Sequence, residues 1–246
     1  MKSIGDAATE LTAVQRPVLC LDTCVLLDVV RAAHRAQLDL MDVVHRLSQT
    51  IATTPDRLQV VVTSLVLREW AQGVEEVQQE ASRWLAATDE RISDIHRAWE
   101  RIGKPLANAA PVYGGAGLVE ELTDLAKALI NAAMVLKEDG DCVARAVHRV
   151  KWKKRPSHKR EIKDSIHLEH YLRLSHALQI GGHARPRVLV STNSSDFWEN
   201  ANTPARAHPD LIPDLASAGL AFYGRLPLAL RALGLLGVPA GPAGGP

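Results

Sequence analysis

The stretch Val18-Leu-Cys-Leu-Asp22-Thr23 is a short apolar run that ends in an acid and a hydroxyl residue. Pro17 precedes it, and a run this short and apolar predicts a strand buried on both faces, as in a parallel sheet. A carboxylate at the carboxyl end of such a strand lies where open α/β sheets place their ligand crevice. Asp22 is therefore the first candidate for a functional residue.

Acidic residues recur in the same relation to other apolar runs. Glu69 follows the run 59–63, and Asp196 follows the run 187–192. Between them, Asp164 stands near the start of a segment with helical spacing. We expect these four acids, which come from separate parts of the chain, to converge on one crevice.

The spacing of apolar residues predicts a fold in which strands and helices alternate. Strands are expected at 18–22, 59–63, 187–192 and 221–223. Helices are expected at 25–33, 35–51, 64 to about 101, 118–137, 139–149, about 160–180 and 226–236. Strands separated by helices, without hairpin signals, indicate an α/β fold with three α/β/α layers around a mostly parallel sheet, extended by additional helices.

We expect one main domain with short appendages. Residues 1–16 are polar and predict an N-terminal arm, and residues 17–238 form the domain, with a helical insertion at about 75–150. The tail at 239–246 is so rich in Pro and Gly that we expect it to be disordered.

Composition excludes several classes of protein. The 246 residues are 46% apolar and 23% charged with a net charge of +1, which is typical of a globular domain. The three cysteines fit neither a disulfide framework nor a Cys-x-x-Cys zinc site. No apolar stretch of 18 residues occurs, and the N-terminus lacks a signal-peptide core, so we expect a reducing, cytoplasmic location without a membrane partner.

The converging acids predict a metal site. Mg²⁺ and Mn²⁺ prefer carboxylate oxygens, and two such ions about 4 Å apart can promote phosphodiester cleavage. Carboxylates that approach one another repel, so a cluster is costly unless a cation is bound. Each acid also has an ordinary interpretation as a helix cap or a solvated surface residue, and the prediction depends on all four together.

The order of these motifs resembles that of the PIN-domain nucleases. The matching segments are Leu-Asp22-Thr23, then Val-Thr-Ser-x-x-x-x-Glu69, Lys-Asp164-Ser-Ile, and Ser-Thr-Asn193-Ser-Ser-Asp196-Phe. The resemblance spans roughly 17–224 and is closer to the larger bacterial members, which also carry a downstream Glu, here Glu169. It implies a PIN-like fold and a Mg²⁺- or Mn²⁺-dependent ribonuclease in which the four acids hold the metal.

The resemblance also implies how the reaction runs and with what the protein associates. Two-metal hydrolysis on this four-carboxylate site would leave a 3′-hydroxyl and a 5′-phosphate. Many family members are toxins of toxin–antitoxin pairs, so an antitoxin or another protein partner, or a homodimer, is compatible with it.

Several neighbouring residues have secondary roles in this prediction. Thr23, Thr192 and Asn193 could support the site, and Cys24 departs from the Asn or Ser that often follows Asp-Thr in the family. Glu161 could join the cluster, although a surface position fits it better. Three histidines share one predicted helix, and we expect them to be surface or hydrogen-bonded residues, although the first is near enough to Asp164 to reach the site: His167, His170 and His176.

The segment 148–163 carries the one dense run of positive charge in the chain. It lies just upstream of Asp164, with an indole among the basic side chains, and such a surface would attract phosphates and stack on a base. The predicted nucleic-acid-binding residues are Arg149, Lys151, Trp152, Lys153, Lys154, Arg155, Lys159 and Arg160. The alternative is an ordinary solvated surface.

Three functions remain open on sequence alone. The leading prediction is a metal-dependent endonuclease acting on RNA. The second is a catalytically inactive PIN-like module that binds nucleic acid or protein, which the four intact acids disfavour. The third is a flap-type DNA nuclease, which usually has more acids and a helical DNA-binding element.

Overall fold

The computed structural model describes residues 1–35, 37–104, 116–157, 161–200, 202–203 and 206–236. Its centre is a sheet of five parallel strands in the order β3-β2-β1-β4-β5. The strands are β1 (Val18–Leu21), β2 (Gln59–Thr63), β3 (Met134–Leu136), β4 (Arg187–Val190) and β5 (Ala221–Tyr223). The predicted α/β class with a parallel central sheet is confirmed.

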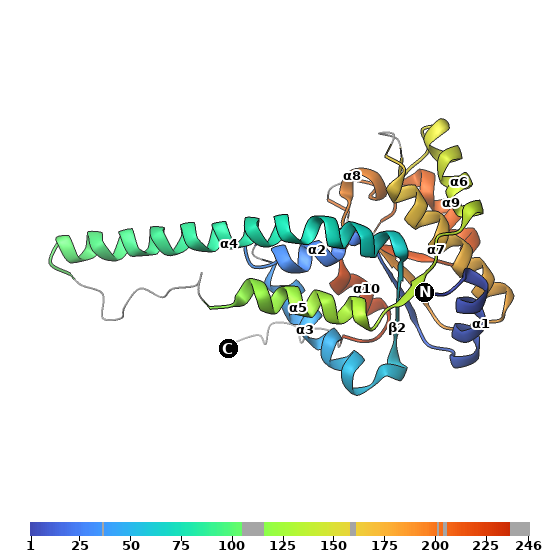
Figure 1. Ribbon diagram of the computed structural model, residues 1–246, viewed down its shortest axis with the longest axis horizontal. Helices are drawn as coiled ribbons and strands as arrows, with labels where there is room; N and C mark the ends of the chain where they lie inside the picture. The colour runs from blue at the N-terminus through green and yellow to red at the C-terminus, as the bar shows by residue number, and fades with distance from the viewer. Residues whose placement is uncertain (36, 105–115, 158–160, 201, 204–205, 237–246) are drawn as a thin grey trace, which may run out of the picture.

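Helices cover both faces of the sheet and complete three layers (Figure 1). On one face lie α2 (Thr23–Arg31), α3 (Leu38–Thr53), the first part of α4 (Ser64–Arg101), α5 (Leu118–Asn131) and α10 (Leu226–Ala232). On the other lie α1 (Ile4–Val14), α6 (Gly140–Lys151), α7 (Lys163–Ile180) and α9 (Ile212–Ala218). The short elements are η1 (Pro55–Arg57), α8 (Ser194–Phe197) and η2 (Pro209–Leu211).

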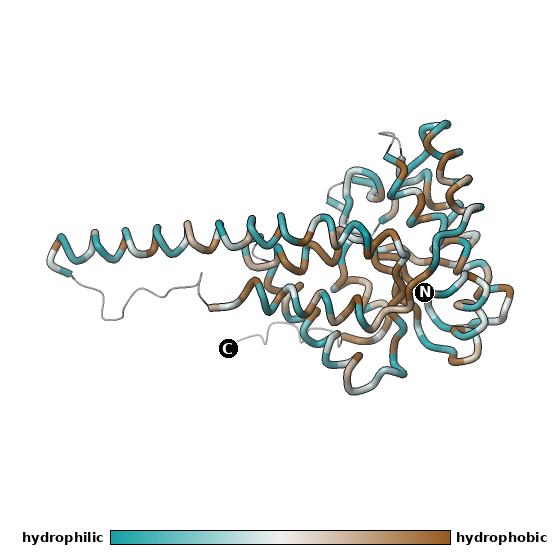
Figure 2. The backbone as a smooth tube through the Cα atoms, viewed as in Figure 1, coloured by the Kyte–Doolittle hydropathy of each residue, from teal (hydrophilic) through white to brown (hydrophobic). Residues whose placement is uncertain are grey.

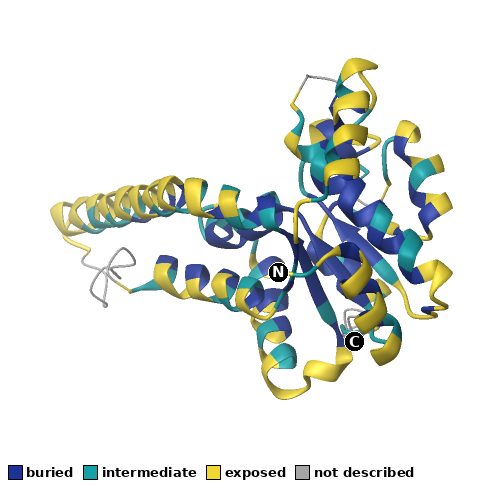
Figure 3. Cartoon of the chain, turned by 45° about the vertical axis from the view of Figure 1, so that its right-hand side comes forward, coloured by how far each residue is buried: buried dark blue, intermediate teal, exposed yellow. Residues whose placement is uncertain are grey.

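The strands are apolar along their whole length because both faces of the sheet are covered. In β1, Leu19 and Leu21 pack into one core, whereas Val18 and Cys20 pack into the other. Successive strand residues point to opposite faces, so a sheet between two helical layers buries every position. Figure 3 shows the sheet as buried ribbon between partly exposed helices.

The third strand differs from the sequence-based expectation. Residues 134–136 were predicted as the end of a helix, but they form β3, which pairs with β2 at the edge of the sheet. Three apolar residues are too few to show a strand period, and pairing with a neighbouring strand decides their conformation. The region 75–150 therefore contributes a strand to the central sheet as well as helices.

The N-terminal segment and α4 also extend the domain. Residues 4–14 form α1, which packs against α7, and Lys2 forms a bridge with Leu136 of β3. The 38-residue α4 packs against α2 and α5 through its first half and then projects away from the domain. Its outer half is largely exposed and mainly hydrophilic (Figures 2 and 3).

Two expectations concern residues beyond the described structure. The tail at 239–246 and the basic residues Lys159 and Arg160 fall outside the described residues. Among the helices that the structure does describe, none is both long enough and apolar enough to cross a membrane.

Candidate metal centre

Asp22 lies at the junction of β1 and α2, at the carboxyl edge of the sheet. Its side chain accepts a hydrogen bond from the backbone N–H of Thr23 at 2.7 Å, so it caps α2 as well as facing the crevice. Ser191, which follows β4, donates its hydroxyl to the other carboxylate oxygen at 2.7 Å. The side chain is only 4% exposed, and these donors fix its orientation.

Cys24 takes part in holding this carboxylate. Its thiol donates to Oδ2 of Asp22 at 3.2 Å and accepts the backbone N–H of Thr192 at 3.2 Å. Burial, followed by the charge of Asp22, raises the pKa of the Cys24 thiol well above its usual value, so the thiol keeps its proton. Cys24 can therefore act as a hydrogen-bond donor to Asp22.

Glu69 reaches the same point from the second turn of α4. Thr63, at the end of β2, caps this helix through its hydroxyl and so sets where the helix begins. The hydroxyl of Thr23 donates to Oε2 of Glu69 at 2.6 Å. Lys163 adds an ammonium group 3.5 Å from Oε1.

The sequence analysis underestimated how closely His167 contacts the acidic residues. Its Nε2 lies 3.0 Å from Oε2 of Glu69 and 4.0 Å from Oδ1 of Asp22. Its Nδ1 lies 2.8 Å from the hydroxyl of Thr63, and only 1% of the residue is exposed. The signal in the sequence was its position three residues after Asp164, which places the two on one face of α7.

The charges around His167 and Glu69 favour an ionised pair in the metal-free protein. Burial opposes the charged imidazole, but the hydrogen bond with Glu69 and the charges of Asp22 and Asp164 raise the pKa of His167. Burial likewise opposes the charged form of Glu69, but the contacts of His167 and Thr23 with its carboxylate lower the pKa of Glu69. The imidazolium thus supplies positive charge to the acidic cluster.

Asp164 joins the cluster from the first turn of α7. The amide of Asn193 donates to its Oδ2 at 2.8 Å. Burial first, and then repulsion from Asp22, raises the pKa of Asp164 to about 8, with Asp196 and Glu69 acting in the same direction. Asp164 lines the same cavity as Asp22 and Glu69.

Asp196 stands slightly apart from these carboxylates. It is buried in α8, where the hydroxyl of Ser195 donates to its Oδ2 at 2.5 Å and Nη1 of Arg155 lies 3.7 Å from its Oδ1. Its charge still acts on Asp164. Of the two acceptors in the last motif, Asn193 lines the cavity at the centre of the site.

The acids face a cavity of about 320 Å³. Its lining includes Asp22, Thr23, Glu69, Lys163, Asp164 and Asn193. One ligand atom from each of Asp22, Glu69 and His167 lies within 4.8 Å of the other two. Opposite ligands of an octahedral Mg²⁺ stand about 4.2 Å apart, since each bond is about 2.1 Å long, so a small adjustment places the carboxylates of Asp22 and Glu69 around one cation, with His167 beside Glu69.

One expected supporting contact differs from the prediction, and the surface position expected for Glu161 is observed. Thr192 acts through its backbone N–H on Cys24, and its side chain lines a neighbouring cavity instead of supporting the site through its hydroxyl. Glu161 is exposed and precedes the start of α7 at Lys163, so it does not share a helical face with Asp164.

The basic segment divides into a buried and an exposed part. Arg149 is only 7% exposed; it forms an ion pair with Glu169, and its Nη2 donates to Asp214 at 2.5 Å. Because the guanidinium of Arg149 is buried and paired with both carboxylates, the prediction that Arg149 belongs to a nucleic-acid-binding surface is wrong. Arg149 instead links α6 to α7 and α9. The exposed part consists of Lys151, Trp152, Lys153 and Lys154, with the indole 60% exposed.

Arg155 connects the basic segment to the metal centre. Its side chain reaches Asp196 and also donates to the backbone carbonyl of Ser195. The exposed Lys153 and Lys154 therefore directly precede Arg155, which contacts Asp196. No protein-family model, curated protein or solved structure matches this chain, so a functional assignment depends on the geometry of this site.

Proposed function

We propose that this protein is a Mg²⁺- or Mn²⁺-dependent endonuclease with a PIN-like site that hydrolyses phosphodiester bonds in RNA. The observation that carries the proposal is the meeting of Asp22, Glu69 and Asp164 at one cavity, although they come from the end of β1, from α4 and from α7. Burial, with repulsion from the neighbouring acids added to it, raises the pKa of Asp164 to about 8. A bound cation would remove that repulsion.

The donor set suits a hard cation. Carboxylates predominate, which favours Mg²⁺ or Mn²⁺ over the softer metals that cysteine and histidine clusters select. Asp22, Glu69 and Asp164 would hold the metal, and Asn193 or Asp196 would complete the site. When bound, the cation would lower the pKa of a water molecule and neutralise charge that develops at phosphorus.

The remaining polar side chains position these ligands and the substrate. His167 and Thr23 both bind Oε2 of Glu69 and so orient that carboxylate. Lys163 is half-exposed at the mouth of the cavity, where its ammonium group can bind a phosphate oxygen. Lys151, Lys153 and Lys154 extend the positive surface, and Trp152 offers an exposed ring for stacking.

A cleavage assay with metal controls tests the function. Purified protein is incubated with labelled single-stranded RNA, structured RNA and a flapped DNA, with Mg²⁺, Mn²⁺ or EDTA. Asp22→Asn keeps a helix-capping side chain but removes the charge, and should abolish cleavage. Asp124→Asn, an exposed acid of α5 whose partner is Lys127, is the matched control and should cleave normally.

The other functions predict different outcomes. Preferred cleavage of flapped DNA would support the DNA nuclease. If no substrate is cut with either metal while Asp22→Asn binds RNA as tightly as the wild type, the protein is a binding module and the proposal fails.

Location and partners belong to the same proposal. Cys20, Cys24 and Cys142 are free thiols in the described structure, which fits the reducing cytoplasm. A protein partner such as an antitoxin stays a prediction of the resemblance.

A further inference from the structure

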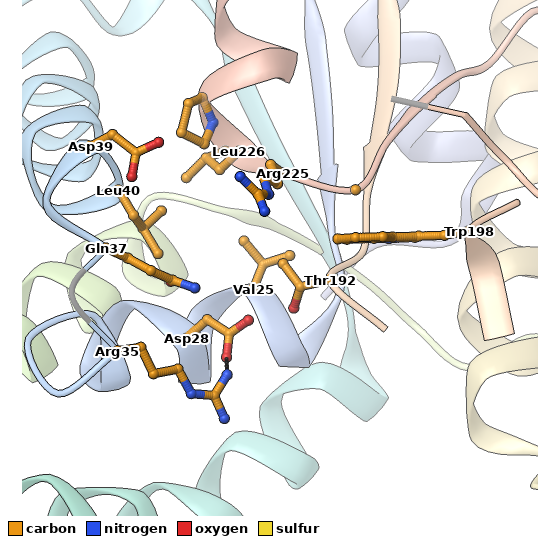
Figure 4. Close-up of a pocket in the computed structure, with 12 residues that line it drawn as sticks. Val25, Asp28, Arg35, Gln37, Asp39, Leu40, Thr192, Trp198, Arg225 and Leu226 are labelled. Atoms are coloured by element: carbon orange, nitrogen blue, oxygen red, sulfur yellow. Dashed lines mark hydrogen bonds and ion pairs between the residues drawn. The ribbon is translucent and has the colours of Figure 1, made fainter. Parts of the chain in front are cut away.

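A second cavity, of about 420 Å³, lies beside the metal centre at the same edge of the sheet. Its size falls within the range of small-ligand sites. It lies between α2, the start of α3, the segment after β4 and the start of α10 (Figure 4). Its lining includes Val25, Asp28, Gln37, Thr192, Trp198 and Arg225.

The two cavities share a wall. At three places, one residue lines the cavity of the metal centre and its neighbour in sequence lines the second cavity. In that order, the pairs are Cys24 and Val25, Leu27 and Asp28, and Asn193 and Thr192. Helix α2 and the segment after β4 thus separate the two cavities and present side chains to both. A single strand whose phosphate lies at the metal centre would reach the second cavity by crossing this wall.

The lining combines an apolar floor with fixed polar groups. Val25 lies at the floor, and the ring of Trp198 closes one end, held by its Nε1, which donates to the carbonyl of Ser191 at 2.9 Å. The amide of Gln37 and the guanidinium of Arg225 both point into the cavity (Figure 4). A mainly polar lining with an apolar side chain and the edge of one aromatic ring offers several hydrogen-bonding groups to a heterocycle.

The charged lining balances two carboxylates, Asp28 and Asp39, against two guanidinium groups, Arg35 and Arg225. The carboxylate of Asp28 is neutralised by Arg35, whose Nη1 lies 2.7 Å away. Arg225 has no carboxylate within ion-pair distance in the described part of the chain, so its charge remains available. An arginine can bind either a phosphate or the edge of a base.

We propose that this cavity receives one unpaired base of the substrate strand, adjacent to the phosphate held at the metal centre. This inference rests on the proposed nuclease function and specifies its substrate as single-stranded RNA. A base inside a duplex is stacked and paired, so it cannot enter the cavity unless it leaves the helix. Arg225 and Gln37 are then specificity-determining residues that bind the inserted nucleotide.

Kinetics on strands with one missing base test this assignment. A single-stranded RNA with one cleavage position is prepared in versions that carry one abasic nucleotide at each flanking position. Wild type, Arg225→Ala and Gln37→Ala are compared with Arg46→Ala, an exposed arginine on α3 away from the cavity. Gln37 makes no capping hydrogen bond, so its substitution leaves the start of α3 intact.

For the wild type, we expect KM to rise roughly tenfold when the abasic nucleotide occupies one particular position next to the cut, and to change little elsewhere. Arg225→Ala should raise KM for the complete strand on the order of tenfold with kcat nearly unchanged, because ground-state and transition-state binding are lost alike. In Arg225→Ala, the abasic nucleotide should raise KM little further, since the substitution and the missing base remove the same contact. Arg46→Ala should match the wild type.

The outcomes separate this inference from the proposed function. If the wild type cleaves every abasic strand equally well, or if Arg225→Ala retains the wild-type sensitivity, the base pocket is ruled out while the nuclease stands. Absence of cleavage by the wild type overturns both.

Discussion

Nε2 of His167 lies 3.0 Å from Oε2 of Glu69, so a buried imidazole and a carboxylate from two different helices meet at the edge of the sheet. The hydroxyl of Thr63 holds the other ring nitrogen, and Thr63 also caps the helix that carries Glu69. One threonine thus fixes both the position of the helix and the orientation of the histidine. This arrangement makes His167 a positioning residue for Glu69.

Substitution of His167 should weaken catalysis without removing it. His167→Gln should lower kcat/KM by roughly 10- to 100-fold, the usual effect of losing a residue that orients a metal ligand. Because the imidazole acts on Glu69, the Mn²⁺ affinity measured by calorimetry should fall in parallel. His176→Gln, on the same helix, is the control, and equal losses in both variants would contradict the assigned role.

Removal of the charge at Asp164 should stabilise the metal-free protein. Its pKa is raised from 3.8 to about 8, so the folded state loses stability relative to the unfolded state as pH rises from about 4 to about 8. Asp164→Asn removes the buried charge and its repulsion by the neighbouring acids. The asparagine can still accept a hydrogen bond from Asn193, and the variant should raise Tm by on the order of 2 °C at pH 8.

The same variant should show only a small gain at pH 4, close to the ordinary pKa of 3.8, where the carboxyl of the unfolded chain is roughly half protonated. Thermal melts in EDTA across this pH range measure the difference, with Asp124→Asn as the control. A gain in Tm that is independent of pH would show that repulsion at Asp164 is not its cause.

Metal binding should tighten with increasing pH. Asp164 must lose its proton to become a ligand, so Mn²⁺ affinity should rise by about tenfold per pH unit below pH 8 and level off above it. Titration calorimetry between pH 6 and 9 tests this. The slope should be smaller in Asp164→Asn, and a flat profile in the wild type would exclude Asp164 as a ligand.

Arg149 should matter for stability, whereas the exposed lysines should matter for RNA. Arg149→Met leaves Glu169 buried without its partner and should lower the free energy of unfolding by about 3 kcal/mol. Lys153→Ala should change that free energy by less than about 0.5 kcal/mol. Denaturant titrations give both values.

RNA binding should show the opposite pattern for these two residues. Lys153→Ala should weaken RNA binding and reduce its dependence on salt concentration, because one phosphate contact is lost. If Lys153→Ala leaves the salt dependence unchanged, the exposed basic surface does not contact the substrate.

The sequence predicted the elements that carry the site more accurately than the site's interior. Short apolar runs before Asp22, Glu69 and Asp196 identified three strands of the sheet, since a parallel strand must be apolar on both faces. It missed β3, whose three residues form a strand only because β2 lies beside them.

What the sequence by itself determined is the α/β class and the carboxyl edge of the sheet as the place where Asp22, Glu69 and Asp164 line one cavity. Only the tertiary structure decided that His167 faces Glu69, that Arg149 is enclosed by Glu169 and Asp214, and that a second cavity adjoins the first. The reason is physical: strand character follows from local apolar patterning, whereas the partner of a buried polar group depends on which distant segments pack against it.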